Sequence, residues 1–239
     1  MWKLTMLCVF CVCDVALGDK AYMFSKLSNK IVKAMDKEDI QIDIFPELPS
    51  KFLKVYYNSG ARVNLGNELT PTQVKDTPMV YWETDFFQQK YYTLIFSDPD
   101  IPNRENATDG EFLHWLVVNI RGTMVPEADE LFEYVPPAPI PGSGLHRCVF
   151  MVFEQENGEF DLTNVKGTDN RTIEGRELFS TNNFVIQNDL IMLPLAGNFF
   201  MAQYDDYVPS IYERFGIEMP THGYWRFSAN GMRLIPDYS

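Results

Sequence analysis

Cysteine is scarce in this chain, and most of it lies at the very beginning. Cys8, Cys11 and Cys13 are three of the four cysteines, so Cys148 is the only one in the rest of the sequence. A single cysteine cannot form an internal disulfide, which excludes a small fold held together by disulfide bonds. The hydrophobic fraction of 46% is ordinary for a globular protein, and we expect a sizeable hydrophobic core instead.

Positive charge is also in short supply. The chain has 20 lysine and arginine residues against 33 aspartate and glutamate residues, and its formal net charge is −13. So acidic a surface repels nucleic acids and anionic lipid headgroups, and we expect no nucleic-acid binding and no broad adsorption to membranes. A site for a small anion would have to be a local exception to the overall field.

Long hydrophobic runs are absent beyond the first residues. Residues 4–17 form one apolar stretch, with Lys3 before it and the small residues Ala16 and Gly18 near its end. This pattern predicts a secretory signal peptide over residues 1–18, because the stretch is short for a transmembrane helix. A retained membrane anchor is the alternative. Cleavage would remove one lysine and one aspartate, so the secreted, extracellular product would keep the net charge of −13 and would not insert stably into a membrane.

Two asparagines lie in glycosylation sequons. Asn106 and Asn170 are each followed two positions later by threonine, with no proline between. Such triplets support the secretory route and predict that the protein is a glycoprotein.

The spacing of apolar residues indicates a β-rich α+β chain. Residues 22–38 have helical spacing, and we assign residues 19–46 to an N-terminal helical extension. Further helices are expected near residues 175–188 and 206–215, and residues 217–239 are expected to form a tail packed on the domain. Strands are expected at residues 53–57 and 61–65 around an Asn-Ser-Gly turn, and at 78–83, 91–97, 112–120, 145–153 and 195–204.

One of these strands is apolar on both alternate sets of positions. In residues 112–120, Leu116 and Val118 share one set with His114, and Trp115 and Val117 belong to the other. A strand that is apolar on both faces is covered on both faces, so we place it in the centre of a layered β structure.

Two acids and two histidines lie at the ends of predicted strands. Asp98 and Asp100 directly follow one strand, and we expect both carboxylates on the same side, because side chains alternate along an extended chain. His114 and His146 lie on two other strands, the second after the Gly-Ser-Gly of residues 142–144. A carboxylate beside an imidazole favours its charged form, so two such pairs would present N–H donors to a phosphate or carboxylate.

Other interpretations of these residues remain open. An Asp-Pro-Asp sequence is usually a solvated turn, and a lone histidine on a strand is usually a core residue. Two histidines and two aspartates can also bind zinc or iron, but no close histidine spacing supports a metal, and we expect none. His146 and Cys148 lie two positions apart and could act as a hydrolase pair. The apolar neighbours of Cys148 favour a buried thiol instead, so we expect no enzymatic activity and no cofactor.

Several blocks of the sequence resemble the phosphatidylethanolamine-binding protein family, which includes Raf kinase inhibitor protein. In order, they are LTPTQVK (69–75), YTLIFSDPDIP (92–102), FLHWLVVNI (112–120), GSGLHR (142–147) and DDYVPSIYE (205–213). The resemblance implies a domain over residues 47–216, in which a large antiparallel sheet packs on a smaller one. It also implies peripheral helices, with a C-terminal helix near the ligand pocket.

The resemblance further implies an anion pocket and its ligands. Its lining would be Asp98, Asp100, His114, Pro139 and His146, with Tyr207 on the closing helix. Family members bind phosphate-bearing headgroups, and several inhibit kinases or serine proteases. We therefore expect the ligand to be a phospholipid headgroup or another small phosphate or carboxylate anion. Inhibition of a protease or kinase through the pocket rim is the alternative function.

Three positions depart from the family pattern. Cys148 and Phe200 stand where the family has tyrosines, and residues 136–140 replace a glycine-rich loop. Each lost hydroxyl could remove on the order of 1 kcal/mol of binding free energy. The Asp/His frame is kept, but the choice of ligand could differ.

Overall fold

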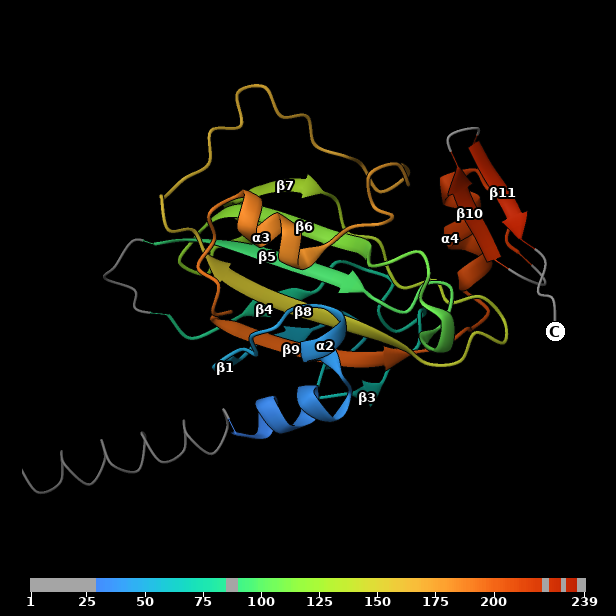
Figure 1. Ribbon diagram of the computed structural model, residues 1–239, viewed down its shortest axis with the longest axis horizontal. Helices are drawn as coiled ribbons and strands as arrows, with labels where there is room; N and C mark the ends of the chain where they lie inside the picture. Colours follow the sequence, from blue (N-terminus) through green and yellow to red (C-terminus); the bar gives the residue numbers. More distant parts are fainter. Residues whose placement is uncertain (1–28, 85–89, 221–223, 229–230, 236–239) are drawn as a thin grey trace, which may run out of the picture.

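The computed structural model describes residues 29–84, 90–220, 224–228 and 231–235 (Figure 1). The predicted signal peptide and the beginning of the predicted extension lie outside these residues. Among the helices that are described, none has the length and apolar character needed to cross a membrane.

A large sheet forms the middle of the molecule (Figure 1). In spatial order its strands are β1 (Lys51–Phe52), β9 (Ala196–Ala202), β8 (His146–Glu154), β5 (Tyr91–Asp98), β6 (Phe112–Arg121) and β7 (Asp129–Phe132), and β3 (Asn67–Glu68) pairs separately with β9. The β9–β8–β5–β6–β7 pairings are antiparallel, as predicted. However, β1 and β3 run parallel to β9, so the sheet is mixed. Each has only two residues, too few to show an alternating pattern in the sequence.

A smaller sheet packs on one face of the large one. It consists of β2 (Lys54–Tyr56) and β4 (Met79–Tyr81), which pair antiparallel. Val55 and Val80 of these strands share a core cluster with Phe96 and Phe150 of the large sheet. The expected turn is present after β2, but the strand predicted at residues 61–65 makes only a single bridge, from Arg62 to Tyr56.

Helices cover the opposite face of the large sheet (Figure 1). Residues 29–37 are helical, followed by α2 (Ile40–Asp43), and α3 (Thr181–Gln187) lies on the same side. Ile31 and Met35, which the helical spacing placed on the apolar face, are both fully buried in this second core cluster. The predicted helix near residues 175–188 forms only in its second half.

Strand β6 is buried on both faces, as predicted, but its alternation is broken. Trp115 and Val117 belong to the cluster beneath the smaller sheet, and Leu116 and Val118 to the cluster beneath the helices. A register shift opposite Phe96 and Ser97 leaves His114 as an extra residue between paired neighbours, which is a β-bulge.

The chain ends in a helix and a hairpin. Helix α4 (Val208–Phe215) has Pro209 in its first turn and ends at Gly216, which has a φ of +69°. Strands β10 (Tyr224–Ser228) and β11 (Gly231–Ile235) pair antiparallel within the segment that we expected to form a tail packed on the domain. The short 3₁₀ helices η2 (Arg104–Asn106) and η3 (Val125–Glu127) complete the described elements.

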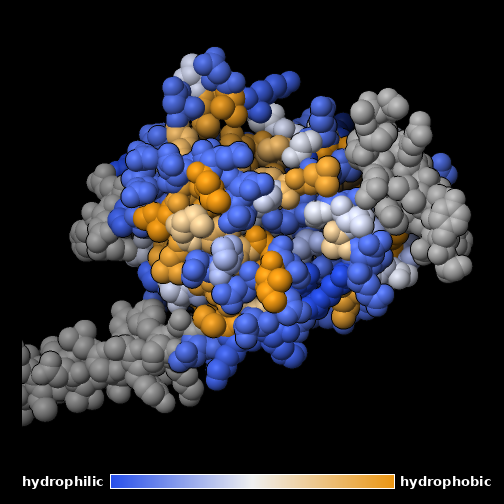
Figure 2. Space-filling model, in the orientation of Figure 1, coloured by the Kyte–Doolittle hydropathy of each residue, from blue (hydrophilic) through white to orange (hydrophobic). Residues whose placement is uncertain are grey.

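The surface is hydrophilic with local apolar patches. Figure 2 shows hydrophobic residues gathered around α3 in the middle of the face, with hydrophilic residues around them. Ile186 on α3 is 55% exposed.

Candidate ligand-binding cavity

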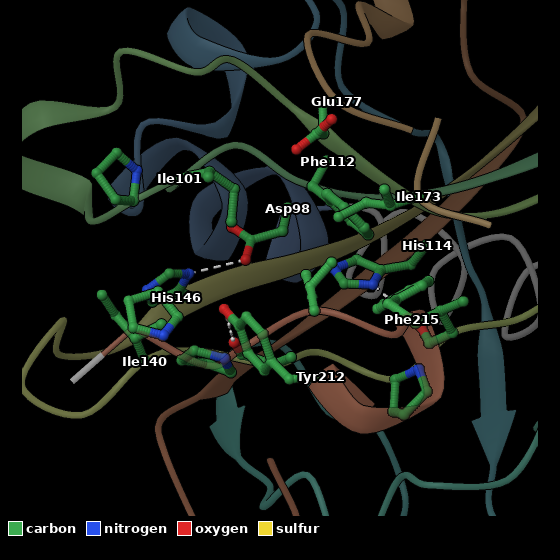
Figure 3. Close-up of a pocket in the computed structure, with 17 residues that line it drawn as sticks. Asp98, Ile101, Phe112, His114, Ile140, His146, Ile173, Glu177, Tyr212 and Phe215 are labelled. Atoms are coloured by element: carbon green, nitrogen blue, oxygen red, sulfur yellow. Dashed lines mark hydrogen bonds and ion pairs between the residues drawn. The ribbon is translucent and has the colours of Figure 1, made fainter. Parts of the chain in front are cut away.

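A cavity of about 100 Å³ lies at the ends of β5, β6 and β8. The loop over residues 135–140, the segment around residues 173–177 and helix α4 close its other sides (Figure 3). Since one water needs roughly 10–15 Å³ of such volume, the cavity has room for a small headgroup but not for acyl chains. Most of its lining is apolar, and no lysine or arginine is among the described residues that line it.

Asp98 and His146 form a buried pair at one end of the cavity (Figure 3). His146 Nδ1 lies 2.8 Å from Asp98 Oδ2, and the other carboxylate oxygen accepts from the backbone N–H of Asp100 at 2.7 Å. Burial lowers the pKa of His146, but the charge and hydrogen bond of Asp98 outweigh it, so the pKa is raised above its ordinary value. This pair agrees with the sequence prediction and favours a charged imidazolium.

The second nitrogen of His146 meets a hydroxyl group. Nε2 lies 2.9 Å from Ser143 Oγ, which is also 2.9 Å from the carbonyl oxygen of Ile140. The carbonyl can only accept, so when His146 is charged, Nε2–H donates to Ser143 Oγ and the hydroxyl donates to Ile140. Ser143 is half-buried in the loop between two glycines that both have positive φ. A ligand oxygen could therefore replace this hydroxyl on His146.

His114 lies at another part of the cavity wall, in a different environment (Figure 3). Its ring packs between Phe96 and Phe112, with ring centroids 5.0 Å away in each case, and its Nδ1 lies 3.0 Å from the Val135 carbonyl oxygen. Burial, together with the positive charge of Arg176, lowers its pKa to about 3. The sequence pattern placed His114 on the same face of the strand as Leu116, and this was wrong. The bulge turns the His114 side chain toward Phe96 instead.

The predicted second Asp–His pair does not form. Asp100 is fully buried and does not line the cavity; its carboxylate instead accepts from the backbone N–H of Arg147 at 2.8 Å and from its guanidinium at 2.6 Å. The reason is that His146 and Arg147 are neighbours on β8 and point to opposite faces, and each faces one of the two aspartates. The two carboxylates therefore bind side chains on different faces of the sheet, and the prediction that both lie on the same side was wrong.

Arg147 connects this site to the N-terminal helices. Its guanidinium also donates to the carbonyl oxygen of Glu38 and lies 2.6 Å from a carboxylate oxygen of Asp43 in α2. Arg104, in the loop after Asp100, contacts Glu38 as well. The N-terminal helices, which precede the predicted domain over residues 47–216, are thus joined by hydrogen bonds and ion pairs to β8, the strand that carries His146.

Helix α4 contributes a different tyrosine from the one predicted. Tyr212 and Phe215 line the cavity, and the Tyr212 hydroxyl lies 3.5 Å from the Ala138 carbonyl oxygen. Tyr207 instead stands at the N-terminus of the helix, where its hydroxyl accepts from Arg214 at 3.0 Å. Residues 212 and 215 are one turn apart and share a face of the helix, whereas residue 207 points elsewhere. Pro139 does line the cavity, as predicted.

An acid that we did not predict also lines the cavity. Glu177 is half-buried, and burial together with the negative charge of Asp109 raises its pKa to about 7. The neighbouring Arg176 is fully buried and donates to carbonyl oxygens, including those of Leu113 and His114. No motif in the sequence marks these two residues, because their position depends on how residues 171–179 fold over β6.

Cys148 and Phe200 lie in the core and not at the cavity. Both are fully buried in the cluster beneath the smaller sheet, and neither lines the cavity. Burial, with added negative charge from the two aspartates, raises the pKa of the Cys148 thiol well above its ordinary value. This thiol lacks the access and the acidity that a nucleophile needs.

The remaining predicted residues lie on the surface loops. Asn106 is exposed at the end of η2, and Asn170 is half-buried in the loop before Arg176. Among the described residues, no group of three or more histidine, cysteine or acidic side chains is placed to hold a metal ion.

Comparison with known proteins identifies the family. The sequence matches the phosphatidylethanolamine-binding protein family over residues 59–198, more than half of the chain. It is 31% identical over 184 residues to odorant-binding protein A5 of Drosophila melanogaster, covering 77% of this chain and 85% of that protein. It is 36% identical over 157 residues to a 26 kDa secreted antigen of Toxocara canis, covering 65% of this chain and 57% of that protein's length.

A solved structure shows the same architecture. The crystal structure of carboxypeptidase Y inhibitor in complex with its cognate proteinase matches with a TM-score of 0.61 and 25% sequence identity, over 74% of this chain and 97% of the inhibitor. The sequence match and the shared fold agree with the resemblance that the ordered motifs indicated. This chain belongs to the phosphatidylethanolamine-binding protein family.

Proposed function

We propose that this protein is a secreted, non-enzymatic binding protein whose cavity receives a small phosphate-bearing headgroup, such as that of phosphatidylethanolamine, against His146. The family and the secreted relative support this function. The exposed Asn106 sequon is compatible with a glycan beside the loop that follows Asp100.

The observation that carries the proposal is the Asp98–His146–Ser143 chain of hydrogen bonds. The buried carboxylate fixes one nitrogen of His146 and favours the charged form of its ring, and the other nitrogen is bonded to a hydroxyl that a ligand could displace. A phosphate oxygen accepts a stronger hydrogen bond from an imidazolium than a hydroxyl does, because the bond is charge-assisted at both ends. The ligand would therefore take the place of the Ser143 hydroxyl.

Calorimetric titration of the full secreted protein with phosphoethanolamine tests this proposal. We expect His146→Ala to weaken binding by about tenfold or more, since a hydrogen bond to a charged group contributes about 1.5–3 kcal/mol. Gln187→Ala, an exposed position on α3, is the matched control and should bind like the wild type. Equal affinity of the wild type and His146→Ala would contradict the proposal.

Inhibition of a protease is the second candidate function. The solved carboxypeptidase Y inhibitor shares the fold and was crystallised with its proteinase, which favours proteases over kinases as partners of a secreted protein. A panel of serine carboxypeptidases assayed with the wild type and His146→Ala separates the two functions. Inhibition that survives the substitution would place the inhibitory surface outside the cavity.

A further inference from the structure

We infer that Asn157 is a site of spontaneous chemical modification, at which the side-chain amide is converted to aspartate or isoaspartate. Asn157 is exposed in the turn that follows β8, and the next residue is Gly158. The site lies outside the cavity, and the inference does not depend on the proposed function. A second Asn-Gly pair, at residues 230–231, begins outside the described part of the chain.

The reaction needs only the chain itself and water. The backbone nitrogen of Gly158 attacks the side-chain carbonyl carbon of Asn157 and forms a C–N bond. The amide nitrogen leaves as ammonia, with the proton that the backbone nitrogen gives up. Water then opens the five-membered imide at either of its two carbonyl carbons, adding a hydroxyl to that carbon and a proton to the nitrogen. Opening at one carbon gives aspartate, and opening at the other gives isoaspartate.

The turn leaves both reacting groups accessible. The Asn157 side chain makes no hydrogen bond within the described part of the chain. The backbone nitrogen of Gly158 lies 3.4 Å from the Gln155 carbonyl oxygen, beyond the usual range of about 2.7–3.2 Å, so its N–H is held only weakly. Glycine also has no side chain to crowd the attacking nitrogen.

Other asparagines lack this combination. Asn58 is also exposed in a turn, after β2, but the next residue is Ser59, whose side chain stands beside the attacking nitrogen. Asn198 is fully buried, and its amide nitrogen donates to two carbonyl oxygens. Of the asparagines that the structure describes, only Asn157 is followed by glycine. Asn58 is therefore the natural internal reference for the effect of that glycine.

Isoaspartate at this position would disturb a buried amide. Gln155 is 3% exposed, and its Nε2 donates to the Gly158 carbonyl oxygen at 2.7 Å and to Asn119 Oδ1 at 3.0 Å. Both N–H groups of this amide are thus used. Isoaspartate routes the main chain through one additional carbon before Gly158 and displaces its carbonyl group, which leaves a buried donor unpaired. Aspartate leaves the main chain unchanged and keeps the bond.

Mass spectrometry of the full protein, aged at mildly alkaline pH and then digested with trypsin, tests the site. Electron-transfer fragmentation locates each conversion and distinguishes isoaspartate from aspartate. We expect the converted fraction to grow severalfold faster at Asn157 than at Asn58. Equal conversion at the two positions, or none at Asn157, would overturn the inference.

Two variants connect the reaction to its two partners. Gly158→Ala adds a methyl group that meets no atom within 4 Å, although the φ of +83° strains it, and should slow the conversion of Asn157. Asn157→Gln leaves Gly158 unchanged and lengthens the side chain, so that the five-membered imide cannot form. Conversion of Asn157 at the wild-type rate in a folded Gly158→Ala protein would contradict attack by this nitrogen.

Urea denaturation tests the effect on the buried amide. The isoaspartate fraction, purified by chromatography, should have a lower denaturation midpoint than fresh protein. Asn157→Asp is the matched control, because it carries the same added charge on an unaltered main chain, and it should keep the wild-type midpoint. An isoaspartate fraction as stable as Asn157→Asp would overturn the predicted loss of the Gln155 hydrogen bond.

Discussion

The cavity has two histidines, and their surroundings favour opposite protonation states. His146 lies against a carboxylate, has partners at both nitrogens and has a raised pKa. His114 lies between two phenyl rings near a guanidinium, and its pKa is lowered to about 3. Within the described part of the chain, its Nε2 has no hydrogen-bond partner. The neighbours of a histidine, and not its presence in a cavity, decide whether it donates to or accepts from a ligand.

Asp98 and Asp100 also differ, because Asp98 lines the cavity and Asp100 faces away from it. Substitution of Asp100 has the largest effect that we predict. Asp100→Ala should lower the free energy of unfolding by about 3–5 kcal/mol, because it leaves the buried Arg147 guanidinium without its main carboxylate. Urea denaturation measures this loss. Asp36→Ala, an exposed position on the N-terminal helix, is the control and should change stability by less than about 0.5 kcal/mol. An unchanged denaturation midpoint in Asp100→Ala would show that Arg147 is sufficiently paired by Asp43 and Glu38.

The neutral state of His114 predicts a pH dependence of stability. An unfolded histidine binds a proton below pH 6.5, whereas folded His114 stays neutral down to about pH 3, so the unfolded state binds more protons in this range. Stability therefore falls as the pH falls, by about 2 kcal/mol between pH 7 and pH 5 for this one group. His114→Phe should lack this part of the decrease when the two proteins are compared by urea denaturation at both pH values. Parallel decreases in the two proteins would show that His114 becomes protonated while the protein is folded.

The charged state of His146 predicts a smaller effect on binding. Asp98→Asn keeps an acceptor oxygen but removes the charge that raises the pKa of His146, and should weaken phosphoethanolamine binding at pH 7 by about tenfold, or 1.4 kcal/mol. Glu105→Gln removes one exposed negative charge from the nearby loop and serves as the control for the general field. Equal losses in both variants would mean that overall charge, and not the Asp98–His146 pair, governs affinity.

The smallest expected effect concerns the hydroxyl that occupies His146 Nε2. Ser143→Ala removes a group that the ligand must displace, so phosphoethanolamine should bind up to about threefold more tightly, a gain of less than 1 kcal/mol. Calorimetry under the conditions used for the wild type measures the change. A loss of affinity would indicate that Ser143 contacts the ligand directly.

The sequence predicted the strands and the family well, because their signals are local. The double apolar pattern of residues 112–120 gave the central strand β6, and the ordered motifs gave the fold and four of the cavity's lining residues, Asp98, His114, Pro139 and His146. Ile31 and Met35 were placed correctly on the buried face of the first helix by their spacing alone.

The rest depended on pairings between distant segments. The partner of Asp100 is set by the alternation of His146 and Arg147 on a neighbouring strand, and the orientation of His114 by a bulge opposite Phe96. Tyr212 could have been found from its helical spacing with Phe215, had the helix face been considered. Glu177 had no signal, since a loop brings it to the cavity.

Nitrogen NMR of the imidazole rings tests the central contrast most directly. The chain has only three histidines, so spectra of the wild type, His114→Phe and His146→Ala assign the two cavity rings. At pH 6 we predict that His146 is protonated on both nitrogens, and that His114 is neutral with its proton on Nδ1 and a bare Nε2. A doubly protonated His114, or a neutral His146, would contradict the account of two cavity histidines held in opposite protonation states.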